Sequence, residues 1–292
     1  MMGDIFVSIE QLYPSFSKGQ KAIADYLLAH YEKVAFMTAA KLGQAVGVSE
    51  STVVRFVTEL GFESYQGLKQ ALHQLSRSRL TALQRVQITE ERIREDGVLG
   101  SVLSNDIINI SQTLAHIDPV EFESAIQKIV AARNVYIIGV RTASMLSEFL
   151  GYNLNLICDN IRPVNASGTE EVFEQIVRIG QGDVIIGISF PRYSQRTIRA
   201  LNFARDRGAD VVAITDAPSS PLAQAATNLL LARSDMASFV DSLTAPMSLI
   251  NALIVGVTMK RRQEIEKRLG ELEQIWDEYQ VYEKQDGGHA DV

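Results

Sequence analysis

The chain has 292 residues, of which 46% are hydrophobic and 22% are charged, and its formal net charge is -7. This composition is that of a soluble globular protein, and the length suits about two domains. The acidic balance at first argues against a nucleic-acid partner, and the single cysteine excludes an internal disulfide framework.

Features that would place the chain in another compartment are absent from the sequence. The N-terminus, MMGDIFVSIE, lacks the basic region and the following apolar run of a signal peptide. The most apolar stretch, Leu243–Met259, is interrupted by polar residues and by Pro246, so we expect no membrane span. Cys158 stands in the apolar context NLNLICDN, which predicts a small buried side chain and no Cys-based zinc site. We expect a cytoplasmic protein.

The charge is distributed unevenly along the chain. Residues 1–80 carry 8 Lys+Arg and 7 Asp+Glu, a net charge of +1, and the remainder carries 20 and 28, a net charge of -8. The acidic surplus therefore lies outside the N-terminal part. Because that part is only weakly basic, any affinity for DNA phosphates must come from the placement of its cations and from dimer symmetry.

The N-terminal part reads as a small all-helical domain. Ser17–Tyr31 is predicted to form an amphipathic support helix. Its inward face carries Ile23 and Leu27, and we expect His30 to complete that face as a core or boundary residue. The next element, Thr38–Gly61, is the most informative stretch of the sequence.

Thr38–Gly61, TAAKLGQAVGVSESTVVRFVTELG, has the spacing of two short helices joined by a tight turn. Gly47 stands at the bend, where it takes a positive φ at little cost. Gly43 is small enough to let the second helix cross closely over the first. Ser49 lies at the N-cap position, where its hydroxyl can accept a bond from a free amide of the second helix. These features predict a helix-turn-helix.

The second helix of this element predicts DNA binding. Apolar residues recur on it at i, i+3, i+4 and i+7 and face inward, so the opposite side is free to lie in a major groove. The alternative is an ordinary helical hairpin, but the matched turn and cap favour DNA binding. We expect Arg55 to read a guanine edge or hold a phosphate, and Val54 to meet a thymine methyl. The expected DNA contacts are Ser49, Ser51, Thr52, Val54 and Arg55.

Beyond Gly61 the helical pattern continues and then weakens. Ser64 is placed to cap a further helix, after which a polar, charged segment predicts a partly helical linker. Ile107–Ile117 is again helical. Asp118-Pro119-Val120-Glu121 is a strong helix start, with an acidic N-cap, proline at the first position and glutamate at the third.

From this point the pattern alternates between short β-rich runs and helices. Near-continuous apolar runs with helices between them predict a parallel sheet covered on both faces. The predicted strands are Val135–Val140, Ile161–Val164, Val184–Ser189, Val211–Thr215 and Asn228–Leu231. The predicted helices are Ala143–Leu156, Glu170–Ile179, Gln195–Arg207 and Pro221–Ala226, with Gly180 and Gly208 as helix stops.

A long helical stretch, Asp241 to about Tyr282, is expected to close the chain before a polar tail. It becomes strongly charged after Met259. Its length, together with the weakly basic DNA-binding part, leads us to expect a homodimer or a homotetramer.

Two strand ends of the predicted sheet are unusually polar. Ligands of open parallel sheets bind outside the carboxyl ends of the strands. Hydroxyls, backbone amides and a guanidinium at a helix N-terminus form a sensible anion site. Each loop alone is better explained by helix capping, but two loops with the same chemistry favour an oxyanion ligand. The expected ligand contacts are Arg141, Thr142, Ser144, Ser189, Arg192, Tyr193, Ser194 and Thr197.

Other kinds of site have little support in the sequence. The Gly-x-Gly-x-x-Gly fingerprint of dinucleotide sites is absent, since the first strand ends in Gly139-Val140-Arg141. None of the four histidines falls at a predicted strand end, and no catalytic constellation is positioned there. We therefore expect no cofactor, no metal ion and no catalytic residue.

The segment SESTVVRFVTELGFESYQGLK resembles the N-terminal helix-turn-helix of MurR/RpiR-type bacterial transcriptional regulators, and the five-stranded part resembles their sugar isomerase (SIS) domain. SIS loops usually show Gly-x-Gly-Ser after the first strand and Ser-x-Ser-Gly-x-Thr after a later one. Gly139 matches the first, although Arg141 and Thr142 follow it. Ser189 and Thr197 match the second, with the bulkier Phe190–Tyr193 between them.

The resemblance implies a regulator that binds a double-stranded DNA operator and whose SIS domain, of flavodoxin-like layout, senses a phosphorylated sugar or related anionic metabolite. The alternative is a SIS-type sugar-phosphate isomerase with an accessory helical domain, and a third reading is a structural interaction protein. We expect an all-α helix-turn-helix domain at 1–79, a linker at 80–104, an α/β domain with a five-stranded parallel sheet at 105–283, and a polar tail at 284–292.

Overall fold

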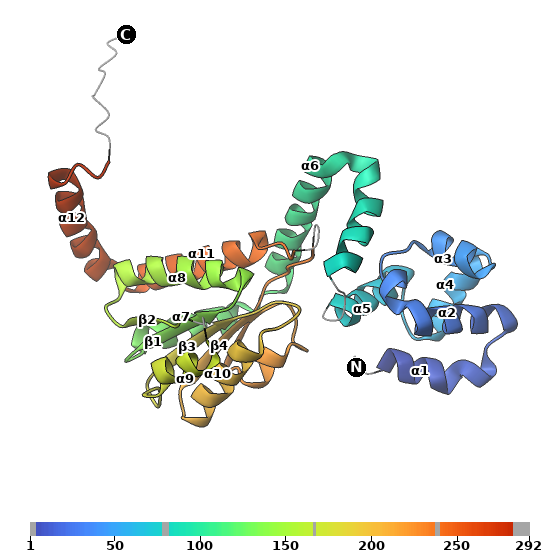
Figure 1. Cartoon of the computed structure of the whole chain (residues 1–292), viewed down its shortest axis with the longest axis horizontal. Coiled ribbons are helices and arrows are strands. Elements are labelled where there is room, and N and C mark those ends of the chain that lie inside the picture. The colour runs from blue at the N-terminus through green and yellow to red at the C-terminus, as the bar shows by residue number, and fades with distance from the viewer. Residues whose placement is uncertain (1–3, 78–81, 166–167, 237–239, 283–292) are drawn as a thin grey trace, which may run out of the picture. The chain divides into compact units, whose positions relative to one another are not determined.

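The computed structural model describes residues 4–77, 82–165, 168–236 and 240–282, and its elements are labelled in Figure 1. The chain divides into two compact units. The first comprises Met1–Ile108 with the short segments Pro191–Tyr193 and Asp235–Ser242, and the second comprises the remainder. The start of the expected linker, residues 80–81, and the expected tail, 284–292, lie outside the described residues.

The first unit is helical, as predicted. Large apolar side chains from four of its helices, including Ile23, Leu42, Phe56 and Leu72, are fully buried in one core. Its first helix, which was not predicted from the sequence, buries Ile5 and Ile9 one turn apart. The elements are α1 Asp4–Leu12, η1 Tyr13–Ser15, α2 Lys18–Val34, α3 Ala39–Val46, α4 Glu50–Glu59 and α5 Tyr65–Arg77.

Helix α2 begins at a capping box. Ser17 Oγ accepts from Gln20 N at 3.4 Å, and Gln20 Oε1 accepts from Ser17 N at 2.9 Å, so two free amides are satisfied. Our expectation for His30 was wrong. His30 is exposed, with a non-helical backbone (φ -137°, ψ 29°) that turns its ring out of the inward stripe and onto Tyr26, 4.9 Å between centroids.

The segment expected as a partly helical linker lies within α6, Ala82–His116. This helix is interrupted at Gly97, where φ is 71° and ψ is 162°. A residue with a side chain would be strained in that conformation, so the glycine accounts for the kink. The predicted helix Ile107–Ile117 forms the last part of α6.

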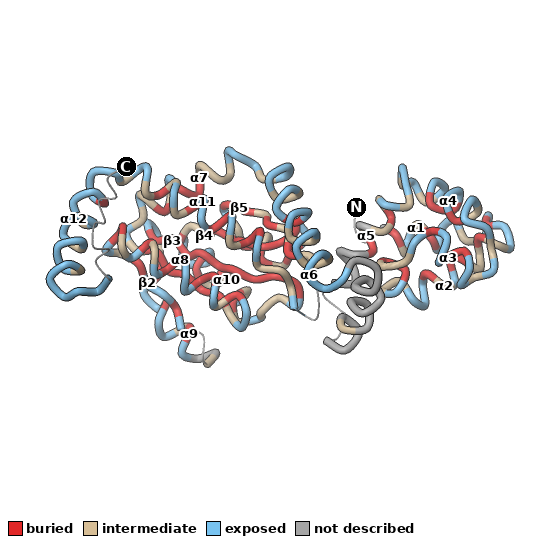
Figure 2. Tube along the Cα trace, turned by 90° about the horizontal axis from the view of Figure 1, so that it is seen from above, coloured by how far each residue is buried: buried red, intermediate tan, exposed pale blue. Residues whose placement is uncertain are grey.

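The second unit contains a five-stranded, all-parallel sheet in the order β2-β1-β3-β4-β5, as predicted. Every residue of β1 and β3 is buried, which explains why these strands read as continuous apolar runs. In Figure 2 they appear as red tube inside the unit. The strands are β1 Val135–Gly139, β2 Ile161–Pro163, β3 Val184–Ile188, β4 Asp210–Thr215 and β5 Asn228–Leu231.

Helices cover both faces of the sheet (Figure 1). One face carries α7 Pro119–Ala131, α8 Thr142–Ile157 and α11 Thr244–Lys260, which pack on one another. The other carries α9 Thr169–Ile176 and α10 Gln195–Asp206. Helices α8 and α9 cover opposite faces, because the order in which strands are added to the sheet reverses between β1 and β3. This is the switch point at which ligands of such sheets bind.

Helix α7 starts as its sequence predicts, but its glutamate has a different role. Asp118 Oδ1 accepts from Val120 N at 2.8 Å and from Glu121 N at 3.3 Å. Glu121 Oε2 accepts from Asn228 Nδ2 at 3.0 Å and from Leu229 N at 3.3 Å. Glu121 therefore fastens the edge strand β5 instead of completing a capping box.

Three predicted boundaries were wrong. Helix α9 ends at Ile176, and Gly180 instead belongs to the turn into β3, where its amide donates to Asp183. The predicted helix Pro221–Ala226 is instead a short 3-10 helix, η2, of four residues, Pro221–Gln224. The terminal stretch divides at Arg261 (φ -113°, ψ 30°) into α11 and α12, Arg262–Glu278.

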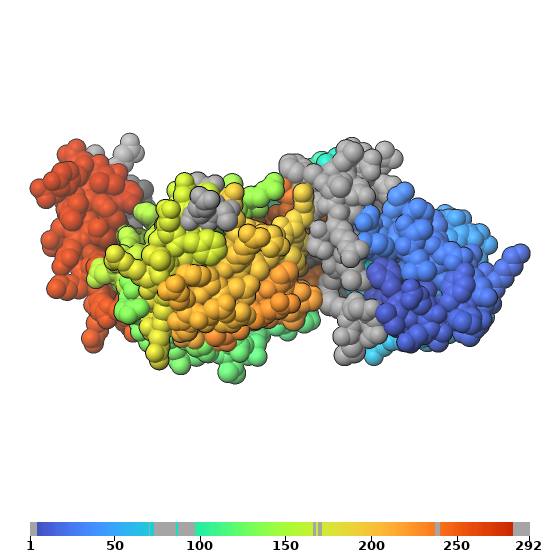
Figure 3. Space-filling model, turned by 60° about the horizontal axis from the view of Figure 1, so that its bottom comes forward, coloured from blue at the N-terminus to red at the C-terminus, as the bar shows by residue number. Residues whose placement is uncertain are grey.

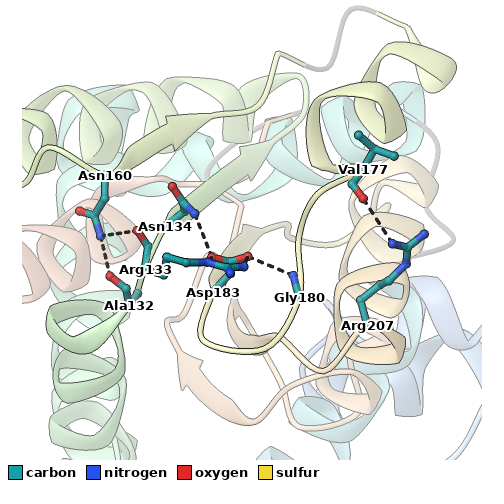
Figure 4. A network of polar contacts seen from close by, with 8 residues as sticks. All are labelled: Ala132, Arg133, Asn134, Asn160, Val177, Gly180, Asp183 and Arg207. Carbon is teal, nitrogen blue, oxygen red and sulfur yellow. Dashed lines mark hydrogen bonds and ion pairs between the residues drawn. The ribbon is translucent and has the colours of Figure 1, made fainter.

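A buried carboxylate joins the amino ends of β1 and β3 (Figure 4). Asp183 accepts from Arg133 at 2.9 and 2.6 Å, from Asn134 Nδ2 at 3.0 Å and from Gly180 N at 3.0 Å. Burial raises the pKa of Asp183, but these hydrogen bonds outweigh burial and hold the pKa below its usual value. Since its acceptors are occupied, Asp183 is a structural group, and the candidate site lies at the opposite edge.

Candidate DNA-binding and ligand-binding sites

The turn between α3 and α4 has the geometry that its sequence predicts. Gly47 ends α3 in the left-handed conformation, with φ 74°. A Cβ on Gly43 would lie 2.7 Å from Val48 O, so the close crossing of the two helices requires glycine there. Ser49 Oγ accepts from Thr52 N at 3.3 Å and caps α4. The predicted helix-turn-helix is confirmed.

Helix α4 presents an exposed face opposite its buried one. Val53, Phe56 and Val57 are fully buried. Ser51 and Arg55 are exposed, and Val54 is 44% exposed. An aliphatic side chain left open beside a guanidinium on the second helix suits contact with base edges in a major groove.

The hydroxyls at the start of α4 form a cluster. Ser49 Oγ lies 2.8 Å from Ser51 Oγ and 2.9 Å from Thr52 Oγ1. Ser49 and Ser51 are exposed and Thr52 is half-buried. This arrangement fixes the hydroxyls relative to one another at the positive end of the helix dipole, where a phosphate oxygen is favoured.

The structure adds two cations that sequence analysis did not single out. A Cβ on Gly19 would lie 3.2 Å from Val48 Cγ1, so the first turn of α2 packs against the helix-turn-helix bend. The preceding residue, Lys18, is exposed there, and Lys41 is exposed on α3. Neither cation could be predicted as a DNA contact from the sequence, because both lie on helices other than α4.

A cavity of about 450 Å³ lies at the carboxyl end of β1, within the second unit. It brings together two of the predicted ligand residues, Arg141 and Ser144. The other polar residues that line it, Ser147, Glu148 and Asn165, were not predicted. Ser147 and Glu148 follow Ser144 by three and four residues on α8, so helical periodicity would have placed them on the same face.

The backbone at the mouth of this cavity is tightly constrained. Arg141 has φ 60° and ψ -125°, a conformation that costs a non-glycine residue on the order of 1–3 kcal/mol. Gly139 lies under the first turn of α8, and a Cβ there would meet Ala143 O and lie 2.8 Å from Ser147 Oγ. The strained arginine is the residue immediately before α8, next to the free amides at the start of that helix.

The loop after β3 is organised mainly by its own hydrogen bonds. Ser189 is buried, and its Oγ accepts from Ser194 N at 3.0 Å. Ser194 caps α10 by accepting from Thr197 N at 3.4 Å. Thr197 is fully buried, and its Oγ1 has no hydrogen-bond partner among the described residues. Serine hydroxyls in this loop therefore shape the turn at the switch point.

The remaining predicted ligand residues are placed as follows. Thr142 is exposed on the first turn of α8. Arg192 is exposed and has a positive φ of 68°. Arg192 and Tyr193 belong to the short segment that is grouped with the first unit, and a ligand role for them stays a prediction.

Other chemical groups of the second unit do not form a competing site. Cys158 is buried, as expected, and burial raises the pKa of its thiol above the ordinary value, which disfavours the reactive thiolate. No cluster of His, Cys, Asp and Glu suited to a metal ion occurs in the described parts of the chain. Within the same parts, no helix combines the length and apolar composition that a membrane span requires.

Both halves of the chain match known protein families. The model of the RpiR-family helix-turn-helix domain matches residues 4–78, and the model of the SIS domain matches residues 128–256. The chain belongs to the RpiR family. The domain order expected from the sequence is the order in which these two matches occur.

Relatives of this RpiR-family chain support the same assignment. The HTH-type transcriptional regulator HexR of Pseudomonas aeruginosa is 24% identical, over 92% of this chain and 94% of that protein. The sugar isomerase domain of an RpiR transcription factor from Sphaerobacter thermophilus is 27% identical, with a TM-score of 0.57 over 59% of this chain and 96% of that chain. The Vibrio vulnificus NanR protein, complexed with ManNAc-6P, shares the fold at 21% identity, with a TM-score of 0.55 over 94% and 98%.

The chain is thus a DNA-binding transcriptional regulator with a C-terminal SIS domain. Other relatives are also named as transcriptional regulators rather than as enzymes. The isomerase alternative therefore has no support from them.

Proposed function

We propose that this regulator reads its operator with α4 and senses a sugar phosphate or related anionic metabolite in the cavity at the end of β1. The observation that carries the proposal is the position of Arg141 in that cavity, directly before the free amides of α8. The proposed setting is the cytoplasm, where operator DNA and phosphorylated metabolites occur together.

The DNA contacts are proposed as follows. Arg55 and Val54 meet base edges, and the hydroxyls of Ser49, Ser51 and Thr52 meet the phosphate backbone near the start of α4. The exposed Lys18 and Lys41 add phosphate contacts on the same unit. A weakly basic unit then binds DNA through a few individually placed cations rather than through its net charge.

The ligand contacts are proposed in two groups. Arg141, Ser144 and the amides of α8 hold the anionic group. Glu148 and Asn165 line the same cavity. Glu148 accepts hydrogen bonds from the hydroxyls of the sugar part, and the Asn165 amide donates to them. NanR of Vibrio vulnificus, whose structure holds ManNAc-6P, supports the choice of a phosphorylated sugar as the ligand class. A ligand contact stays a prediction for four residues that do not line this cavity: Thr142, Ser189, Ser194 and Thr197.

A homodimer or homotetramer is part of the proposal, because one weakly basic unit makes few phosphate contacts and two units on a palindromic site double them. The ligand acts by favouring one arrangement of the protomers, and hence one spacing of the paired α4 helices.

The test begins with selection of genomic DNA fragments on the full chain, followed by thermal-shift measurements with paired metabolites. Each pair consists of a sugar phosphate and the same sugar without phosphate. We expect a retained operator fragment and a rise in melting temperature with the phosphorylated member only. Failure to retain any fragment would contradict the DNA assignment, and equal shifts from both members would contradict the anion site.

A further inference from the structure

Helix α12 carries an apolar face that the described part of the chain does not cover. Its first turns are fixed to the α/β unit: Ile265 is buried, and Arg268 forms an ion pair with Asp159. The space-filling view shows this C-terminal part of the chain as a red lobe at the end of that unit (Figure 3). Large apolar residues in the later turns of α12 and at its C-cap remain exposed, including Ile275 at 48% and Tyr279 at 72%.

The apolar residues of α12 form a regular seam. Ile265, Leu269, Leu272, Trp276 and Tyr279 recur at alternating intervals of four and three residues. This is the spacing of the a and d positions of a coiled coil, in which each side chain packs between side chains of a facing helix. Ile265 packs in the core of the α/β unit, so the part of the seam that lies beyond it, from Leu269 to Tyr279, is the part suited to pairing with another helix.

The charges of α12 are segregated along its length. Within α12, residues 262–268 contain three Lys or Arg and two Glu, a net charge of +1. Residues 269–282 contain four Asp or Glu and no Lys or Arg, a net charge of -4. Two copies placed antiparallel would set the basic half of each against the acidic half of the other, whereas parallel copies would face like charges.

We propose that α12 pairs antiparallel with α12 of a second copy of this chain. An interface formed by the same patch on both partners must be self-complementary, and a seam with oppositely charged ends meets that condition under a twofold axis. DNA is excluded as the partner of this surface, because the acidic outer half of α12 would repel its phosphates.

This pairing rests on α12 itself and does not depend on the proposed ligand or operator. It specifies which surface joins two protomers, which the proposed function leaves open. If the chain dimerises through another surface, the pairing of α12 is wrong, but the proposed DNA and ligand binding are unaffected.

The first test uses the full chain and its single tryptophan, Trp276, which lies in the seam. Upon dilution we expect light scattering to show a dimer separating into monomers and the Trp276 emission to shift to longer wavelength. Leu269→Glu with Leu272→Glu is expected to give monomers at concentrations where the unaltered chain is dimeric. The matched control Gln274→Glu, an exposed position on the opposite side of the helix, is expected to leave the dimer intact. A dimer that tolerates the paired substitutions would overturn the proposal, as would a monomeric unaltered chain.

The second test addresses the antiparallel direction through charge reversal. Arg262→Glu with Lys267→Glu makes both halves acidic, and Glu271→Lys with Glu273→Lys and Glu278→Lys makes both halves basic, so each set alone is expected to weaken the dimer by about tenfold or more in dissociation constant. All five substitutions in one chain exchange the signs of the two halves and are expected to restore most of the affinity. If the fivefold variant is as weak as the variants that carry one set, the antiparallel arrangement is wrong. Circular dichroism checks that each variant keeps its helical content.

Discussion

At the scale of single residues, the α/β domain depends on groups whose polar atoms are fully used. Asp183 is buried between the amino ends of β1 and β3 and accepts bonds from three residues. Each such bond to a charged acceptor contributes about 1.5–3 kcal/mol in typical proteins, less where the donor is exposed. Arg133 is exposed, so much of its attraction is screened by solvent.

The depressed pKa of Asp183 predicts how stability changes with pH. The folded state holds the carboxylate ionised to lower pH than the unfolded state does. Its contribution is therefore complete above the ordinary carboxyl pKa and is lost as pH falls through the lower, folded value. We expect Asp183→Asn to reduce the free energy of unfolding by about 1–3 kcal/mol at neutral pH, with a smaller loss as pH falls. Urea unfolding across pH measures this, with Asp206→Asn, an exposed carboxylate, as the control.

Two glycines of the helical unit predict opposite effects of the same substitution. Gly43→Ala places a Cβ 2.7 Å from Val48 O, a backbone atom that yields only if the helices separate. We expect it to destabilise the first unit by about 1–3 kcal/mol. Gly67 lies in α5, where a Cβ meets only ordinary contacts, the nearest at 3.7 Å. Gly67→Ala is expected to stabilise by about 0.5–1 kcal/mol through helix propensity. Thermal unfolding that ranks the two variants in the reverse order would contradict the close crossing of α3 and α4.

At the scale of elements, the regular features of the sequence were sufficient to predict the five strands and the helix-turn-helix. Continuous apolar runs such as Val184–Ile188 identify buried parallel strands, and Gly47 with Ser49 identifies the turn and cap. Helix ends were harder, because tertiary contacts help to decide them. Gly180 was expected to stop α9, but its amide donates to Asp183, which also binds Arg133 fifty residues away in the sequence. The prediction that His30 faces the core was wrong because apolar periodicity does not reveal a local departure from helical backbone.

The candidate ligand site was predicted only in part. The polar loop after β1 identified Arg141 and Ser144, because their neighbours in sequence are also their neighbours in space. Asn165 comes from the loop after β2, and sequence alone does not say that this loop closes over the end of β1. Lys18 was missed for the same reason, since only the packing of α2 brings it beside the helix-turn-helix.

The exposed face of α4 predicts separable effects on DNA binding. Arg55→Ala is expected to weaken operator binding by about 1–3 kcal/mol and to relax discrimination at one base position. Lys18→Ala is expected to weaken binding to all sequences alike and to lower the slope of log affinity against log salt by about 1. Fluorescence anisotropy with matched and mismatched operators at several salt concentrations measures both. Equal loss of discrimination in the two variants would contradict the division between base and phosphate contacts.

At the scale of the whole molecule, the proposal links two sites on two units through a shared equilibrium. If a metabolite changes the affinity for the operator, the operator must change the affinity for the metabolite by the same factor. Typical couplings amount to about 1–3 kcal/mol, or about 5–150-fold. The size of the effect is set by how differently the two protomer arrangements bind the ligand, and tight binding without such a difference changes nothing.

The most direct test of the central claim is operator affinity with and without the sugar phosphate that the thermal-shift screen identifies, for the unaltered chain and for Arg141→Ala. For the unaltered chain we predict a change in dissociation constant of about 5-fold or more upon saturation with the metabolite. Arg141→Ala should bind the operator as well as the unaltered chain does in the absence of metabolite, and should lose the response. A response that survives Arg141→Ala, or an operator affinity that the bound metabolite leaves unchanged, would contradict the proposal that this cavity controls DNA binding.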